Sequence, residues 1–169
     1  MPRSNKTVCK ITIIGPRPYN LGGHDLDNDI RRNIYQKIQE IVQRYLKNNN
    51  IVLLGLTGLE MGCEQDFAEI CLENKIDYIV YLTHENIEKR WGSYPQYLID
   101  RYTRLLDHSM ETHTISDGNY SPKKVMIKNK RLIKEADIIL YISHPFKKNK
   151  ICSILNYCKE LDKKVVLIS

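Results

Sequence analysis

IVLLGLTGLEMGCEQDFAEICLE, residues 51–73, contains a strand, a glycine-rich turn and a helix, and it decides the fold. The unbroken apolar run Ile51–Leu54 predicts a strand buried on both faces, as in a parallel sheet. Gly58 and Gly62 mark the turn, and apolar residues then recur at helical spacing from about residue 63. Glycine permits close backbone approach, and a helix start offers unpaired N–H groups, so this turn is a natural ligand site.

The same alternation of strands and helices continues along the whole chain. Besides 51–54, main strands are predicted at 9–14, 77–82, 137–142 and 164–168, with a short strand at 113–116. About five main strands alternating with helices predict an α/β fold, a three-layer Rossmann-like arrangement with a mainly parallel sheet and helices on both faces. With 169 residues, 42% of them hydrophobic, residues 1–169 can form a single domain around one core.

Composition predicts a protein of a reducing cellular compartment with no membrane-spanning segment. The cysteines are odd in number, which favours free thiols, and no run reaches the roughly 18 apolar residues of a membrane span. The first residues lack the apolar core of a signal peptide, so we expect a cytoplasmic protein. No His or Cys spacing suggests a metal site, and no cofactor is expected. The cysteines are Cys9, Cys63, Cys71, Cys152 and Cys158.

The net charge of +6 is concentrated late in the chain, between residues 123 and 150. A lysine-rich face of this kind attracts nucleic acids or smaller phosphate ligands through its field, although most such faces are only solvated.

Arg17 lies in a stiff loop directly after the first predicted strand. Pro16 and Pro18 restrict the loop, and Gly22 and Gly23 give it a second bend. Open α/β sheets bind ligands at the carboxyl ends of their strands, where an arginine can form paired hydrogen bonds with a phosphate or carboxylate.

The turn after the second strand carries acids and lacks the Lys-Ser/Thr ending of a P-loop. Carboxylates at this position repel phosphate but accept hydrogen bonds from ribose hydroxyls or base amino groups. Asp66 is expected to complement the helix dipole. For Glu64 and Glu69 the same role and a ligand-binding role are both open.

Between residues 83 and 109, aromatic residues alternate with cations around Trp91. Three interpretations fit this pattern: a surface that stacks nucleic-acid bases, a lid that packs Trp91 over a nucleotide, or an amphipathic helix. In the last case the inward residues are Tyr97, Leu98, Tyr102, Leu105 and Leu106.

Taken together, these motifs resemble the SLOG superfamily, which joins the DNA-processing protein A fold to the Lonely Guy phosphoribohydrolases. The likeness spans nearly the whole chain and is greatest to the small YspA/YoqJ-like branch of bacteria and phages. Its opening pattern is similar to residues 15–18 and 21–23, and its glycine–acid pattern to residues 58–69, with Glu64 where the family has aspartate. The segments Trp91–Tyr102, Tyr120–Pro122 and Lys128–Asn129 also resemble family elements.

The chain departs from this family pattern at two places. The glycine-rich GGT element, part of the family's phosphate wall, corresponds to residues 147–150, which contain no glycine. The PGGxGTxxE motif of the Lonely Guy enzymes is absent, and with it their catalytic glutamate.

The resemblance and the residues together predict binding of a nucleotide or nucleotide-derived molecule at the carboxyl edge of the sheet. An N-glycosidase or phosphoribohydrolase that uses Glu64 or Glu69 is one alternative, and single-stranded DNA binding is another. The resemblance also implies a homodimer and a link to phages or mobile elements. The expected ligand-binding residues are Gly15, Arg17, Pro18, Gly58, Gly62, Glu64, Glu69, Trp91 and Asn129.

Overall fold

The computed structural model describes residues 5–143 and 148–169, without the side chains of residues 148–152. Its centre is a six-stranded sheet in the order β4-β3-β2-β1-β5-β6, and every neighbouring pair is parallel. The predicted α/β class is therefore confirmed. The strands are β1 (Thr7–Ile14), β2 (Ile51–Thr57), β3 (Tyr78–His84), β4 (Glu111–Ser116), β5 (Ile138–Ile142) and β6 (Lys164–Ile168).

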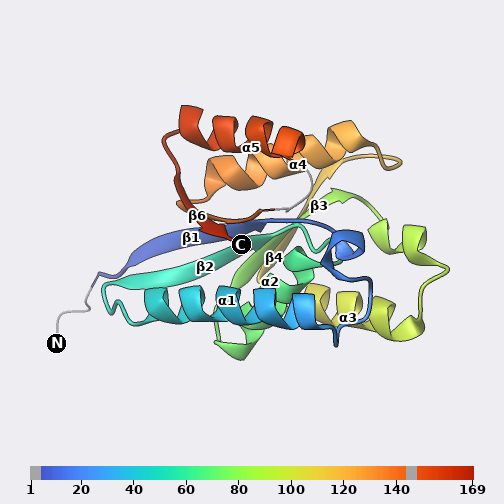
Figure 1. Cartoon of the computed structure of the whole chain (residues 1–169), viewed down its shortest axis with the longest axis horizontal. Coiled ribbons are helices and arrows are strands. Elements are labelled where there is room, and N and C mark those ends of the chain that lie inside the picture. The colour runs from blue at the N-terminus through green and yellow to red at the C-terminus, as the bar shows by residue number, and fades with distance from the viewer. Residues whose placement is uncertain (1–4, 144–147) are drawn as a thin grey trace.

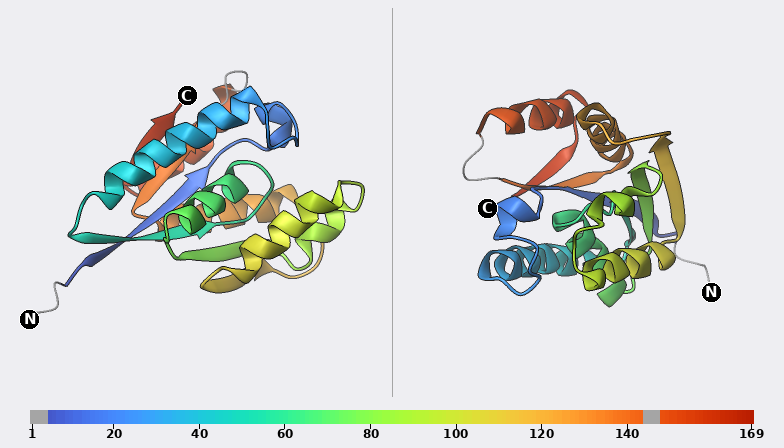
Figure 2. Two further views of the ribbon diagram at one scale, coloured as in Figure 1. Left: turned by 90° about the horizontal axis from the view of Figure 1, so that it is seen from below. Right: turned by 90° about the vertical axis from the view of Figure 1, so that its right-hand side faces the viewer.

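Helices cover both faces of the sheet, which gives the predicted three layers (Figure 1). One face carries α1 (Asp29–Leu46), α2 (Cys63–Glu73) and α3 (Gln96–Asp107), with α2 between the other two (Figure 2). The other face carries α4 (Pro122–Glu135) and α5 (Lys148–Glu160). Two short 3-10 helices, η1 (Pro18–Leu21) and η2 (Ile87–Trp91), lie in the loops after β1 and β3.

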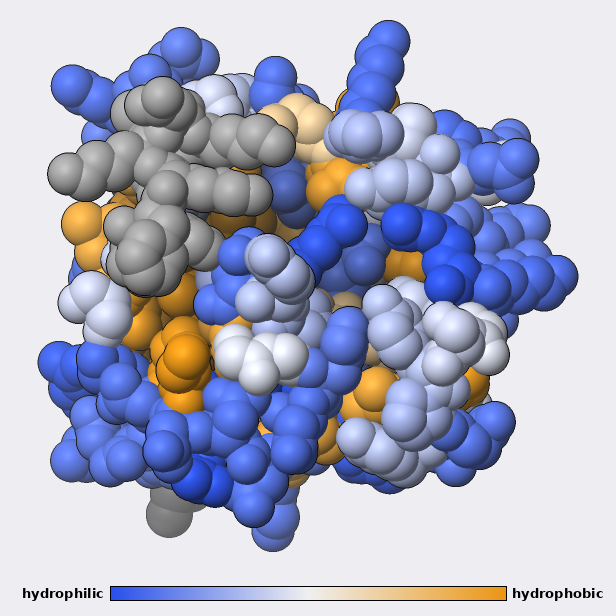
Figure 3. Space-filling view, turned by 45° about the vertical axis from the view of Figure 1, so that its right-hand side comes forward, coloured by the Kyte–Doolittle hydropathy of each residue, from blue (hydrophilic) through white to orange (hydrophobic). Residues whose placement is uncertain are grey.

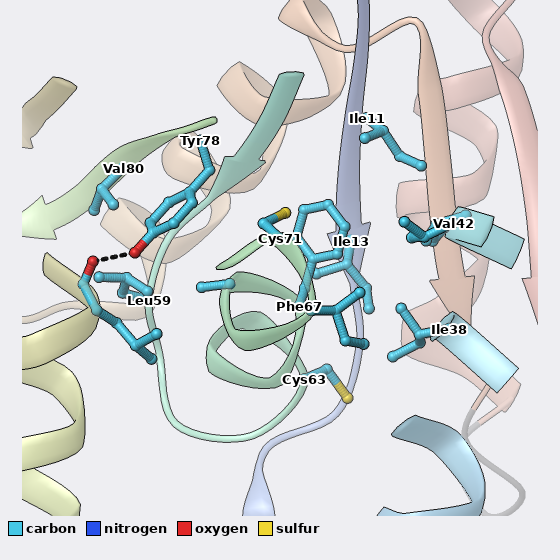
Figure 4. Packing of buried hydrophobic residues seen from close by; sticks show 14 of the residues in the cluster. Ile11, Ile13, Ile38, Val42, Leu59, Cys63, Phe67, Cys71, Tyr78 and Val80 are labelled. Atoms are coloured by element: carbon cyan, nitrogen blue, oxygen red, sulfur yellow. Dashed lines mark hydrogen bonds between the residues drawn. The ribbon is translucent and has the colours of Figure 1, made fainter. Parts of the chain in front are cut away.

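The strand residues divide between two buried clusters, one on each face. Because successive strand residues point to opposite faces, Ile11 and Ile13 join the cluster under α1–α3, whereas Ile14 joins the cluster under α4 and α5. Figure 4 shows Phe67 of α2 at the centre of the first cluster, near Ile13 and Cys71. Strands buried on both faces explain the unbroken apolar runs of the sequence.

The chain reverses its direction of travel across the sheet at β1. Strands β1 to β4 follow one another towards one edge, and the chain then returns through α4 to place β5 on the other side of β1. Helix α1, which follows β1, and helix α5, which follows β5, therefore cover opposite faces of the sheet, and such a switch point leaves a crevice at the carboxyl ends of the strands.

Several predicted boundaries and faces differ from the structure. Strand β3 extends to His84, beyond the predicted end at residue 82, and β1 begins at Thr7. Tyr97, predicted to face inward, is about half exposed because it lies in the first turn of α3, beyond the edge of the packed stripe. None of the described helices is both long and apolar enough to cross a membrane.

Candidate functional site

Three hollows adjoin one another along the carboxyl edge of the sheet. The inner hollow, of about 80 Å³, and the middle hollow, of about 190 Å³, share Arg17 and Glu60 in their walls. The middle hollow and the outer hollow, of about 510 Å³, share Arg90. We call the three together the crevice. Figure 3 shows that the molecule is hollowed on this side and that strongly hydrophilic side chains flank the hollow.

A buried ion pair forms the floor of the inner hollow. Lys128 of α4 is 1% exposed, and its Nζ lies 2.7 Å from Oε1 of Glu64, the second residue of α2. The other oxygen of Glu64 accepts a hydrogen bond from the backbone N–H of Glu60 at 2.9 Å. Both carboxylate oxygens of Glu64 are thus already in use within the protein.

Gly58 makes room for this ion pair. A Cβ atom at residue 58 would lie 2.6 Å from Nζ of Lys128 and 3.0 Å from Oε1 of Glu64. Gly62, at the N-cap of α2, has a φ of 103°, a conformation that side chains rarely adopt. The glycine turn in this protein therefore accommodates a lysine head and a helix start.

Arg17 projects from the loop after β1 and lies between the inner and middle hollows. Its Nη2 donates a hydrogen bond to the hydroxyl of Tyr120 at 3.2 Å. Tyr120 follows a turn in which Gly118 has a positive φ, and Nζ of Lys124 donates to the carbonyl oxygens of Asp117 and Asn119. Two loops far apart in the sequence thus meet at this arginine.

Two residues that line the middle hollow have a buried polar atom without a hydrogen-bond partner in the described structure. These atoms are Oε1 of Glu60 and Nδ1 of His24, whose ring lies 4.3 Å from that of Tyr94. Native proteins pair nearly all their buried polar groups, so unpaired atoms in a hollow mark a place where a ligand or a water completes the bonding.

Trp91 forms part of the wall of the middle hollow but is mostly packed in the core. It is 6% exposed, and its ring meets that of Tyr102 edge to face at 5.0 Å. Leu98 and Leu105 of α3 are also buried, as an amphipathic helix requires.

The outer hollow is built around the ring of Tyr120. The guanidinium carbon of Arg90 lies 3.4 Å from the centre of this ring, and the ring of His84 meets it edge to face at 6.3 Å. His84 is 4% exposed, and its Nδ1 has no partner in the described structure. Burial lowers the pKa of His84, and the nearby charge of Arg90 lowers it further, so the imidazole is neutral at pH 7.

The structure brings most of the predicted site residues to the crevice. Gly15, Arg17, Glu64 and Asn129 line the inner hollow, and Pro18 and Trp91 line the middle one. The two turn glycines adjoin the crevice through their contacts with lining residues, Gly58 with Lys128 and Gly62 with the Pro16 carbonyl oxygen.

Glu69 lies apart from these residues, on the side of α2 that faces α3. It forms ion pairs with Arg104 and, at 3.7 Å, with Arg101. Two residues five positions apart on a helix point about 140° away from each other, so Glu64 and Glu69 cannot face one hollow. Asp66 is likewise more than a helix-dipole partner, because its Oδ1 lies 2.6 Å from Arg31 and 3.0 Å from Arg101.

The crevice also has lining residues outside the expected ligand-binding set, among them Glu60, His84, Arg90 and Tyr120. Extending the third predicted strand by two residues would have placed His84 at its carboxyl end. The pairing of Arg90 with Tyr120 joins residues 30 positions apart, and no local pattern signals it. The segment 147–150, which replaces the family's glycine-rich element, has its side chains outside the described residues.

No family model matches the sequence, and no curated protein matches it. Among solved structures, the chain is similar to DNA processing protein A from Helicobacter pylori, described as having a unique single-stranded DNA binding mode. The likeness has a TM-score of 0.59 at 15% identity and covers 96% of this chain. The chain shares the fold of the part of DNA processing protein A that it matches.

This DNA-processing-protein-A fold agrees with the SLOG resemblance of the sequence. DNA processing protein A from Streptococcus pneumoniae is also similar, with a TM-score of 0.39 at 12% identity over 94% of this chain. The chain spans 66% of the Helicobacter protein and 58% of the Streptococcus protein, so it is the shorter in each comparison.

Proposed function

We propose that the protein binds single-stranded DNA along the crevice. The observation that carries this proposal is the arrangement of Arg17 and Arg90, which stand at the two junctions between adjoining hollows. A single nucleotide needs one hollow, whereas a row of hollows with cations between them suits successive phosphates of a strand. Lys89 adds a further cation to the outer hollow.

The wider charge distribution supports the same proposal. The chain has a net charge of +6, and α4, which contributes Lys128 and Asn129 to the crevice, is rich in lysine. Such a field attracts a polyanion and speeds its association. The described DNA-binding of the Helicobacter protein, which shares the fold, is a further reason to test this ligand first.

Fluorescence anisotropy with a labelled oligothymidylate of about eight nucleotides tests the proposal, since single-strand sites span about 4 to 16 nucleotides. The association constant should fall as salt rises from about 50 to 200 mM. The plot of its logarithm against the logarithm of the salt concentration should have a slope of about −0.7 for each phosphate neutralised. Arg17→Gln should weaken binding and reduce the magnitude of the slope by about 0.7. Arg44→Gln, an exposed change in the last turn of α1, should alter neither quantity. No binding by the unmodified protein at low salt would reject the proposal.

Binding of a free nucleotide is a second candidate, favoured by the unpaired buried atoms of Glu60 and His24. Both residues line the middle hollow together with Arg17, so a base or ribose bound there would lie beside them while the arginine meets the phosphate. This candidate predicts that a mononucleotide raises the melting temperature and that Arg17→Gln abolishes the rise. An unchanged melting temperature with every common mono-, di- and cyclic nucleotide would count against it.

The geometry gives less support to N-glycoside hydrolysis. Of the two candidate acids, Glu64 is nearer the crevice, but it already binds Lys128 and a backbone N–H, and Glu69 faces α3.

We also propose that the protein belongs to the YspA/YoqJ-like branch, forms a homodimer and is cytoplasmic. The motifs at residues 15–18 and 21–23 support the branch.

A further inference from the structure

We propose that the outer hollow is a nucleobase pocket, in which a base stacks on Arg90 and turns one edge towards His84. This inference rests on the proposed nucleotide or single-strand binding and names the part of the ligand that the outer hollow takes. At about 510 Å³, the hollow falls within the range of about 300 to 1,000 Å³ that is usual for ligand pockets.

The stacking surface is already held in place. Arg90 is exposed to solvent, yet its guanidinium carbon lies 3.4 Å from the centre of the Tyr120 ring. A long exposed side chain normally samples many rotamers, whereas contact with the Tyr120 ring holds the guanidinium of Arg90 over the face of that ring. Bases stack on arginine guanidinium planes as they do on aromatic rings. A base on Arg90 would therefore complete a stack of base, guanidinium and tyrosine ring.

Tyr120 is in turn fixed by its surroundings. Its hydroxyl accepts a hydrogen bond from Arg17, and Lys124 holds the preceding turn through two carbonyl oxygens. The platform is thus assembled before a ligand arrives, so little conformational entropy is lost on binding. The hydrogen bond from Arg17 to Tyr120 also connects the proposed base pocket with the proposed phosphate contact.

His84 contributes a polar side chain to the wall of the hollow. It is 4% exposed, and its Nδ1 atom is buried without a partner in the described structure. Since the imidazole is neutral, one ring nitrogen donates and the other accepts a hydrogen bond. The edge of every nucleobase offers both donors and acceptors, whereas a phosphate offers acceptors alone. This difference favours a base over a phosphate at His84.

The test compares an oligothymidylate of about eight nucleotides with a matched strand of abasic residues, which keeps every phosphate. The unmodified protein should bind the base-bearing strand between about 5-fold and 150-fold more tightly, the effect of one base stack. Arg90→Lys keeps the charge and removes the plane, so this preference should vanish while affinity for the abasic strand stays the same. Arg44→Lys, the same change at an exposed residue in the last turn of α1, is the matched control and should keep the preference. Equal affinity of the unmodified protein for both strands, or an undiminished preference in Arg90→Lys, would overturn the base pocket.

The outcome also separates this inference from the proposed function. Equal, salt-dependent binding of both strands would reject the base pocket and leave DNA binding in place. Binding of neither strand would reject DNA binding, and calorimetric titration with the four free nucleosides would then decide about the pocket. Heat of binding that is lost in Arg90→Lys would support the pocket, and the absence of heat with all four would overturn it.

Discussion

Nζ of Lys128 and Oε1 of Glu64 lie 2.7 Å apart in the interior, where α4 and the start of α2 reach the same end of the sheet from opposite faces. This pair ties the two helix layers together beneath the crevice. Each residue neutralises the charge of the other, and a lone charge at either position would be buried without a counter-charge.

Replacement of Lys128 by methionine should therefore strongly destabilise the protein. The change leaves Glu64 without its buried counter-charge, and breaking such a pair costs about 3–5 kcal/mol of unfolding free energy. Lys123→Met, on an exposed part of the same helix, should change stability by no more than about 0.5 kcal/mol. Urea unfolding of both variants measures the difference, and equal midpoints would show that the pair contributes nothing to stability.

Gly58→Ala should destabilise the protein through the same pair. The new methyl group would lie 2.6 Å from Nζ of Lys128 and would push the buried lysine away from Glu64. Overpacking of this kind costs about 1–3 kcal/mol. At Gly92 an added Cβ would meet only a carbonyl oxygen at 3.8 Å, so Gly92→Ala is the control. Thermal unfolding of the two variants tests the prediction, which fails if Gly58→Ala melts no lower than Gly92→Ala.

Asp66→Asn should also lower stability, because one carboxylate oxygen serves two guanidinium groups. Oδ1 of Asp66 lies 2.6 Å from Arg31, which is buried, and 3.0 Å from Arg101. The amide would leave both cations without this counter-charge, at a cost of about 3–5 kcal/mol. Asp29→Asn removes an almost fully exposed carboxylate that pairs with Arg32, and its effect should stay within about 1 kcal/mol. Chemical denaturation should show this contrast, and similar losses in both variants would contradict it.

The stability of the protein should fall in acid partly because of His84. Its pKa in the folded protein lies below its ordinary value of 6.5, since burial and the charge of Arg90 disfavour the imidazolium. Below that value the unfolded chain binds a proton that the folded chain does not, so stability is lost as pH falls. One such group changes the unfolding free energy by at most about 1.4 kcal/mol per pH unit.

The measurement compares the unmodified protein with His84→Gln by urea unfolding at about pH 7.5 and about pH 5.5. Carboxylates contribute to the acid loss in both proteins, so the difference between the two profiles isolates residue 84. His84→Gln should lose less stability on acidification. Parallel profiles would mean that His84 titrates with the same pKa in the folded and unfolded chains.

Local patterns determined the α/β class and most of the elements. The apolar runs predicted the buried strands, and β6 begins at Lys164 as predicted. Helix α4 begins at Pro122, and proline favours the first position of a helix. These features follow from periodicity and from the restricted backbone of proline, which act over a few residues. The loop position of Arg17 at the carboxyl end of β1 follows from the same short-range rules.

Tertiary structure alone decided which side chains share the crevice. Glu64 and Glu69 look equivalent in the sequence, yet the rotation of α2 directs one towards Lys128 and the other towards Arg104. Arg90 and Tyr120 meet only because β3 and β4 end side by side and their following loops converge. Such contacts depend on the relative placement of distant segments, which packing of the whole core fixes and no short stretch of sequence encodes.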